Sequence, residues 1–166
     1  MVRHRRTSGY SLMEVMMVVA ILGIISSVGA SLMLQTNRFF IFTRTRLDLQ
    51  REARSTMYVM TRELRQAQSN SIIMDRLSAS QPFYSRITFT KIGGAAMTFQ
   101  QNGNQLEQIV GTKKMILSRN LRYLAFTFPR SDDLTIVSVS VTLEEAIYQG
   151  QKKALHMASE KVQVMN

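Results

Sequence analysis

Glu14 is the residue in the N-terminal part of the chain whose position most requires a chemical reason. It stands at the edge of residues 15–37, a run that contains no charged side chain. A carboxylate within a membrane helix costs on the order of 2.5–3.5 kcal/mol at the helix centre, and pairing with a cation offsets much of the cost of burying either charge. Gly9 precedes Glu14, and Arg3, Arg5 and Arg6 precede Gly9. The carboxylate of Glu14, at the edge of an apolar segment, therefore needs a chemical reason.

The apolar segment is long enough to cross a bilayer, which takes about 20 helical residues. Three interpretations are open from hydropathy alone. A cleaved secretory signal is one, since residues 26–30 resemble a small-residue cleavage site, although the apolar run continues beyond them to Leu34. A plain signal anchor is the second. The third is a specialised leader that ends at Gly9, and Gly9 together with Glu14 favours it.

Residues 9–14 read Gly-Tyr-Ser-Leu-Met-Glu and are followed by the apolar run. This junction resembles the leader signal of type IV pilins and type II secretion pseudopilins, which usually has Gly-Phe-Thr-Leu-Ile-Glu. The chain departs from that pattern at Tyr10, Ser11 and Met13, each close in size or chemistry to the usual residue. The resemblance covers about residues 3–34, and the chain looks more like a minor subunit than an abundant major one.

The resemblance implies a role for each residue of the junction. A prepilin peptidase would cut between Gly9 and Tyr10 and methylate the new amine of Tyr10. Glu14 of an incoming subunit would pair with the amine of a subunit already in the filament. The leader would be cytoplasmic and the remainder exported across the plasma membrane. The implied partners are the peptidase, other pilin or pseudopilin subunits, an assembly platform membrane protein and membrane lipid.

The pattern stays helical beyond the apolar run and becomes amphipathic. Apolar residues recur every three or four positions, which predicts one helix from about Leu12 to Gln68 with a single apolar face. The residues of this stripe are Leu49, Ala53, Met57, Met60, Leu64 and Ala67. The resemblance and the apolar stripe both require a partner surface that covers this face.

Short β-type runs follow a loop at residues 78–82. Residues 137–143 alternate Val or Leu with Ser or Thr, which indicates a half-buried strand, and residues 124–128 alternate in the same way. The expected strands are 84–92, 96–100, 105–110, 114–118, 122–128, 134–143 and an edge strand at 160–164, whereas 144–155 is ambiguous between loop and helix. The predicted fold is α+β: a long N-terminal helix whose second half packs on a C-terminal antiparallel β-sheet. The expected segments are a leader (1–9), a membrane and filament-core helix (10–37), an amphipathic continuation (38–75) and a sheet domain (76–166).

The chain is basic, with 21 Lys and Arg against 11 Asp and Glu in 166 residues. An arginine series along the helix has three interpretations: a solvated face, salt bridges between subunits, or a nucleic-acid binding site. The interleaved aromatic residues typical of nucleic-acid sites are missing from this series. Its members are Arg38, Arg44, Arg46, Arg51, Arg54, Arg62 and Arg65. Within the membrane segment, Gly23, Ser26, Ser27 and Gly29 would allow close helix approach. Ser31 stands where many major pilins have Pro.

No catalytic set is found in the sequence. Cysteine is absent, His4 belongs to the leader, and His156 stands apart from other metal-ligand residues. Asp132 and Asp133 suit either a plain turn or part of a calcium loop. We expect no enzyme activity, no metal and no cofactor. The expected function is a minor structural subunit of a type II secretion pseudopilus or a type IV pilus, and the alternative is a membrane-anchored basic protein that binds DNA or lipid.

Overall fold

The computed structural model describes residues 9–148 and 152–164. The predicted leader lies outside the described residues except for Gly9. The chain divides into two compact units, residues 1–41 and 42–166. Helix α1 (Leu12–Leu64) contributes residues to both. The fold is α+β, with one long N-terminal helix followed by antiparallel sheets, as predicted.

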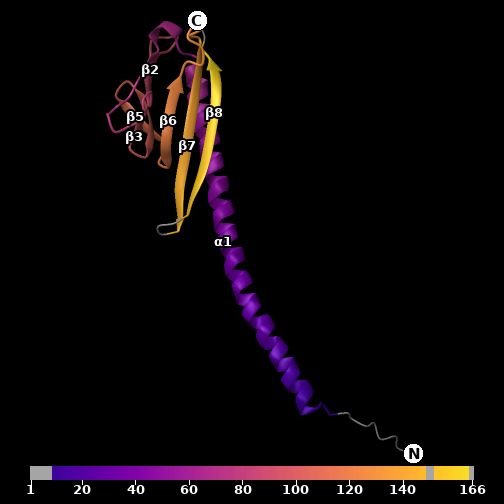
Figure 1. Ribbon diagram of the computed structural model, residues 1–166. Coiled ribbons are helices and arrows are strands. Elements are labelled where there is room, and N and C mark those ends of the chain that lie inside the picture. Colours follow the sequence, from indigo (N-terminus) through magenta and orange to yellow (C-terminus); the bar gives the residue numbers. More distant parts are fainter. Residues whose placement is uncertain (1–8, 149–151, 165–166) are drawn as a thin grey trace, which may run out of the picture. The chain divides into compact units, whose positions relative to one another are not determined.

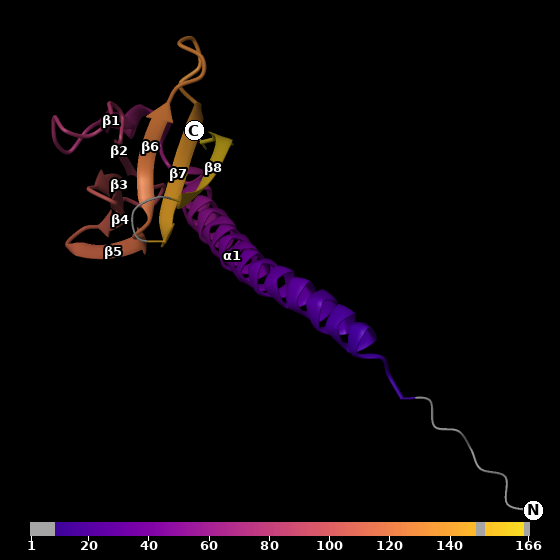
Figure 2. The same cartoon turned by 60° about the horizontal axis from the view of Figure 1, so that its bottom comes forward.

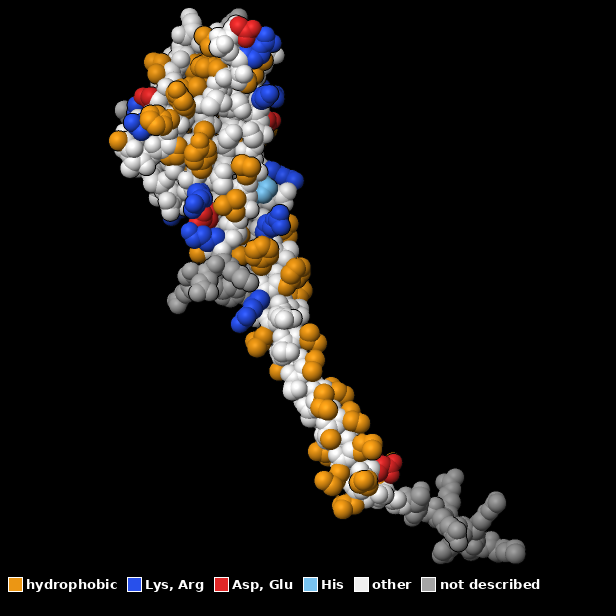
Figure 3. All heavy atoms as spheres, in the orientation of Figure 1, with side chains coloured by type: hydrophobic (Ala, Val, Ile, Leu, Met, Phe, Trp, Pro, Cys, Tyr) orange, Lys and Arg blue, Asp and Glu red, His pale blue; other side chains and the backbone are white. Residues whose placement is uncertain are grey.

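In the first unit, no other described part of the chain covers the side chains of α1. Every described residue from Tyr10 to Phe40 is exposed, and Figure 3 shows the hydrophobic side chains spread along this part of the helix. The helix is long and apolar enough to cross a membrane by its length and composition.

In the second unit, the strands form two antiparallel sheets rather than the single sheet that was expected. The first sheet has the order β1-β2-β3-β4-β5 and the second the order β6-β7-β8 (Figures 1 and 2). The first consists of β1 (Ile73–Asp75), β2 (Arg86–Thr90), β3 (Ala96–Asn102), β4 (Gln105–Val110) and β5 (Lys113–Ser118). The second consists of β6 (Leu121–Thr127), β7 (Ile136–Tyr148) and β8 (Lys152–Gln163).

Two tight turns join β3 to β4 and β4 to β5. Each has a two-residue loop that begins with a glycine of positive φ, Gly103 and Gly111, both at +58°. Glycine adopts this conformation without the steric cost that a Cβ brings, and a glycine at the first loop position suits hairpin turns that match the twist of the strands. These turns fix the register of three consecutive strands.

The core lies between the apolar stripe of α1 and the inner faces of the strands. Leu49, Ala53, Met60 and Leu64 are fully buried, and Met57 nearly so, which confirms the predicted stripe. The predicted alternation holds on β7, where Val137, Val139, Val141 and Leu143 are all buried. On β6, Ala125 is buried together with Leu124 and Phe126, so the predicted alternation does not hold there. Other strand residues of the core include Ile87, Phe89 and Phe99.

The end of α1 corrects the prediction that the helix reaches Gln68. The last turn tightens, because the amide of Gln66 bonds to the carbonyl of Glu63 and that of Ala67 to Leu64. The Gln68 amide then donates to the Thr90 carbonyl at 3.0 Å. From Gln68 onward, pairing with the end of β2 therefore takes the place of helical hydrogen bonds.

Of the ambiguous residues 144–155, those that the structure describes, 144–148 and 152–155, lie in the long strands β7 and β8. Pairing runs from Ile136 opposite Gln163 to Tyr148 opposite Lys152. Glu144 receives ion pairs from Arg122 on β6 and Lys153 on β8. Cross-strand charge pairs of this kind hold polar residues in a strand that no hydrophobic alternation would predict.

Candidate functional site

The candidate site is the start of α1, where Gly9, Tyr10 and Glu14 lie close together in the chain. Gly9 and Tyr10 precede the helix, which begins at Leu12. Tyr10 is 82% exposed. A Cβ placed on Gly9 would meet no heavy atom within 4 Å. The chain itself therefore leaves room for a side chain at Gly9, and any requirement for glycine there must come from a molecule that binds this segment.

Ser11 caps the first turn of the helix. Its Oγ accepts a hydrogen bond from the Met13 amide at 3.2 Å, and its carbonyl accepts from the Glu14 amide at 3.0 Å. A serine in this position satisfies an amide that the helix leaves without a partner. Ser11 and Glu14 have the spacing of a capping box, a local signal from which this role could have been predicted.

Glu14 lies in the first turn of α1. The positive end of the helix dipole favours a carboxylate there. Beyond it, the helix displays apolar side chains on all sides through Leu34. The structure thus places the carboxylate at the boundary between a solvated, capped helix end and an apolar surface.

Two serines of the apolar segment form hydrogen bonds within the helix. Ser27 Oγ donates to the Ile24 carbonyl at 2.8 Å, and Ser31 Oγ donates to the Val28 carbonyl at 2.9 Å. Such bonds remove the need for water in a lipid environment. Around Gly23 and Gly29 a Cβ would find open space, so the chain leaves these positions free for the approach of another helix. The helix continues through Ser31 without a break.

The arginine series does not form one site. Arg51 pairs with Asp48 at 3.6 Å, and Arg62 pairs with Glu63 at 2.7 Å. Glu52 instead accepts a hydrogen bond from Asn120 at 3.0 Å. Among the described residues, no side-chain hydrogen bond or ion pair engages the remaining arginines of the series, which are Arg38, Arg44, Arg46, Arg54 and Arg65.

Asp132 and Asp133 occupy the loop between β6 and β7 and have partners from their own loop. Arg130 donates to Asp132 from both its Nε and an Nη, at 3.0 and 2.6 Å. The amide of Thr135 donates to Asp133 at 2.9 Å. These hydrogen bonds lower the pKa of both carboxyl groups below the ordinary range. In residues 9–148 and 152–164 no three His, Cys, Asp or Glu side chains gather in a group that could hold a metal ion.

The fold and the start of α1 together define a class of protein. Its members have a long N-terminal helix, apolar in its first part, that is followed by antiparallel sheets. Residues 4–30 match the family model of the prokaryotic N-terminal methylation motif, which is characteristic of type IV pilins and pseudopilins. No curated protein matches the chain. The motif supports a pilin-like or pseudopilin-like prepilin and points to a structural subunit. It also implies processing by a prepilin peptidase and assembly with other pilin subunits.

Proposed function

We propose that the protein is a minor structural subunit of a type II secretion pseudopilus or a type IV pilus. Its leader is removed between Gly9 and Tyr10, and the new amine of Tyr10 is methylated. The observation that carries this proposal is the methylation motif at residues 4–30, which includes the start of the exposed, apolar first part of α1. A helix of this kind needs either lipid or other helices as its surroundings.

The proposal gives Glu14 its partner. After cleavage, the ammonium group of Tyr10 and the carboxylate of Glu14 lie about one helical turn apart along the chain. In an assembled filament, the carboxylate of one subunit would meet the ammonium of its neighbour. A charge that is buried alone is costly, and two opposite charges that are buried together recover much of that cost. The pair would therefore select one register between neighbouring helices.

In the membrane, residues 10–37 would form a single crossing, with the leader in the cytoplasm and the sheet unit on the opposite side. The apolar helix would pass from lipid into the filament core during assembly. The proposed partners at this step are the peptidase, an assembly platform membrane protein and other subunits. The internal hydrogen bonds of Ser27 and Ser31 support this exchange, because neither hydroxyl requires water.

The test is the identity of the mature N-terminus. The chain is produced in membranes with and without a prepilin peptidase, and the intact protein is analysed by mass spectrometry. We expect the peptidase to remove residues 1–9 and to leave a methylated Tyr10. An intact leader would contradict the proposal and would favour the membrane-anchored basic protein instead.

Gly9→Leu is the informative variant for this test. Open space surrounds the Cβ position of Gly9, so the substitution leaves the fold unchanged and its effect falls on the peptidase. We expect cleavage to stop. Gly23→Leu is the matched control, since its Cβ position is equally open and it lies away from the cut bond, so cleavage should proceed as in the wild type.

A further inference from the structure

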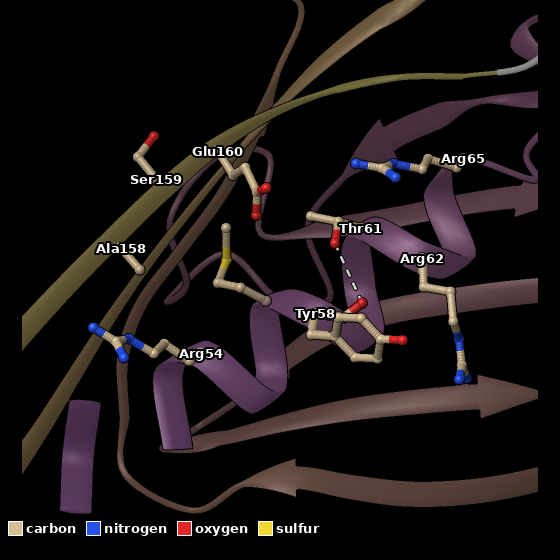
Figure 4. A pocket seen from close by; sticks show the side chains of 9 residues that line it. Arg54, Tyr58, Thr61, Arg62, Arg65, Ala158, Ser159 and Glu160 are labelled. Atoms are coloured by element: carbon tan, nitrogen blue, oxygen red, sulfur yellow. Dashed lines mark hydrogen bonds between the residues drawn. The ribbon is translucent and has the colours of Figure 1, made fainter. Parts of the chain in front are cut away.

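A groove lies between the second half of α1 and strand β8, wholly within residues 42–166. Its volume is about 430 Å³, and Figure 4 shows the side chains that surround it. One wall is a single stripe of α1, and the other is a short stretch of β8. The lining residues are Arg54, Met57, Tyr58, Thr61, Arg62, Arg65, Ala158, Ser159 and Glu160.

The groove exists because the residues on the inward face of β8 are not buried midway along the strand. Ala154 and Val162 are buried, at 2% exposure each. Between them, Ala158 is half-buried and Glu160 is exposed, although both belong to the same alternating face. The small side chain of Ala158 leaves the space between strand and helix unfilled.

The groove follows an edge of the strand rather than one of its faces. Neighbouring strand residues point to opposite faces, yet Ala158, Ser159 and Glu160 all line the groove. Strand β8 pairs with β7 and has no second neighbour among the described strands. The unpaired edge of β8 therefore borders the groove.

The hydrogen-bond pattern identifies the peptide groups at this edge. The Val164 amide donates to the Thr135 carbonyl at 2.8 Å, which makes these two residues a hydrogen-bonded pair. Hydrogen-bonded and non-hydrogen-bonded pairs alternate along an antiparallel ladder, and the register is regular from Gln163 to Lys153. The peptide groups of Met157, Ser159 and Lys161 consequently face away from β7.

The helix side of the groove carries positive charges that no described acidic side chain neutralises. Arg54 and Arg65 are exposed, and neither makes a side-chain hydrogen bond or ion pair with another described residue. Arg62 pairs with Glu63 and lies 6.0 Å from the ring centre of Tyr58. Glu160 is the single acidic residue of the lining.

We propose that this groove binds an extended segment of another protein chain that carries carboxylate side chains. The segment would add to β8 as a further strand, with main-chain hydrogen bonds to Met157, Ser159 and Lys161. Its helix-facing carboxylates would pair with Arg54 and Arg65, because arginine matches the planar geometry of a carboxylate. The inference depends on the groove alone and is independent of leader cleavage.

A nucleic acid fits the groove less well than an acidic peptide. A sugar–phosphate backbone has no pattern of amides and carbonyls to match the edge of β8. Single-stranded nucleic acids also bind by stacking successive bases on exposed aromatic rings, whereas the lining has one aromatic residue, Tyr58. The edge of β8 therefore favours a peptide.

The experiment measures binding to the full chain in detergent micelles. The probe is a short labelled peptide in which glutamate alternates with threonine, and the control peptide replaces glutamate by glutamine. We expect the glutamate peptide to bind at least about tenfold more tightly, a difference of about 1.4 kcal/mol, and increasing salt to weaken its binding. Equal binding of both peptides would overturn the proposal.

Single substitutions test separately the two features of the groove that would bind the peptide: its positive charge and the unpaired edge of β8. Arg54→Ala and Arg65→Ala should each weaken binding about tenfold, while Arg119→Ala, an exposed arginine outside the groove, should leave it unchanged. Glu160→Gln removes the acidic lining residue and should tighten binding.

Ser159→Pro removes an outward amide without removing a bond to β7, since proline is tolerated on the solvent side of an edge strand. It should abolish peptide binding, and Ser159→Ala should retain it. Thermal unfolding checks that both variants keep the wild-type fold. Peptide binding that survives Ser159→Pro would overturn strand addition. A single-stranded DNA probe that binds more tightly than the peptide, and loses affinity in Arg54→Ala, would assign the groove to nucleic acid instead.

Discussion

Glu107 shows how a single charged residue is held inside the sheet unit. Its side chain is fully buried on β4. Burial by itself raises the pKa of this carboxyl group, but hydrogen bonds outweigh that effect and leave the pKa below the ordinary value. The donors are Lys114 at 2.7 Å, Gln100 at 2.8 Å and Asn102 at 2.9 Å. The folded state therefore favours the ionised form of Glu107.

This arrangement predicts a pH dependence of the free energy of unfolding. A carboxyl group with a lowered pKa in the folded state contributes stability above its unfolded pKa, about 4.3, and loses it as the pH falls through the folded value. Lys114→Met should lower the free energy of unfolding at neutral pH by about 1–3 kcal/mol, because a buried carboxylate loses a charged partner. It should also reduce the further loss below about pH 4.3. Urea unfolding at several pH values measures both effects.

Lys113→Met is the matched control for this prediction. Lys113 is the exposed neighbour of Lys114 on β5, and no ion pair joins it to another described residue. Its substitution should change the free energy of unfolding by less than about 0.5 kcal/mol. Equal effects of the two substitutions would show that Lys114 does not stabilise Glu107.

At the scale of elements, the contact of α1 with the strands depends on its apolar stripe. Met60→Ala should lower the free energy of unfolding of the sheet unit by about 2–5 kcal/mol, since Met60 is fully buried and its removal leaves a cavity. Met157→Ala makes the same chemical change at a side chain that is 69% exposed, and it should have little effect. Thermal unfolding followed by circular dichroism compares the two, and a similar loss in both would contradict the packing described here.

The sequence was informative about elements with a regular hydrophobic pattern. It predicted the apolar stripe of α1, and the expected strand at residues 105–110 coincides with β4. It missed β1, whose three residues carry no pattern of their own and are held by pairing with β2 and by the ion pair of Asp75 with Arg86. It also did not predict the division into two sheets, which falls between the consecutive strands β5 and β6. Whether two consecutive strands pair depends on how their hydrogen-bonding edges are oriented in the folded chain.

The candidate functional residues also differ in how far the sequence could predict them. Gly9, Tyr10 and Glu14 were selected because a local motif joins them, and a local motif is visible in a sequence. The arginines of the groove were considered only as part of a long basic series. Arg54 and Arg65 differ from Arg51 and Arg62 in having no acidic partner among the described residues, and this information exists only in the folded chain.

At the scale of the whole molecule, Glu14 provides a test of assembly. Glu14→Val should leave membrane insertion and leader cleavage intact and should prevent incorporation into filaments, because a neighbouring ammonium group would lose its counter-ion. Immunoblots of sheared filament and membrane fractions measure incorporation, and mass spectrometry of the N-terminus measures cleavage.

Two further variants control for the stability of the helix end. Ser11→Ala removes the cap and costs the helix about 1 kcal/mol but keeps the charge, so it should still assemble. Glu14→Asp also keeps the charge and should assemble at least in part. Wild-type incorporation of Glu14→Val would contradict the proposed pairing of charges.

The strand order of the two sheets has a consequence for how the chain reaches its folded state. Each strand pairs with the next strand along the chain, from β1 to β5 and again from β6 to β8. Such neighbours close short loops, and proteins rich in short-range contacts fold faster than those that must join distant segments. Each hairpin can form as soon as its second strand is available. The sheet unit can therefore acquire its strand pairing progressively, one hairpin at a time.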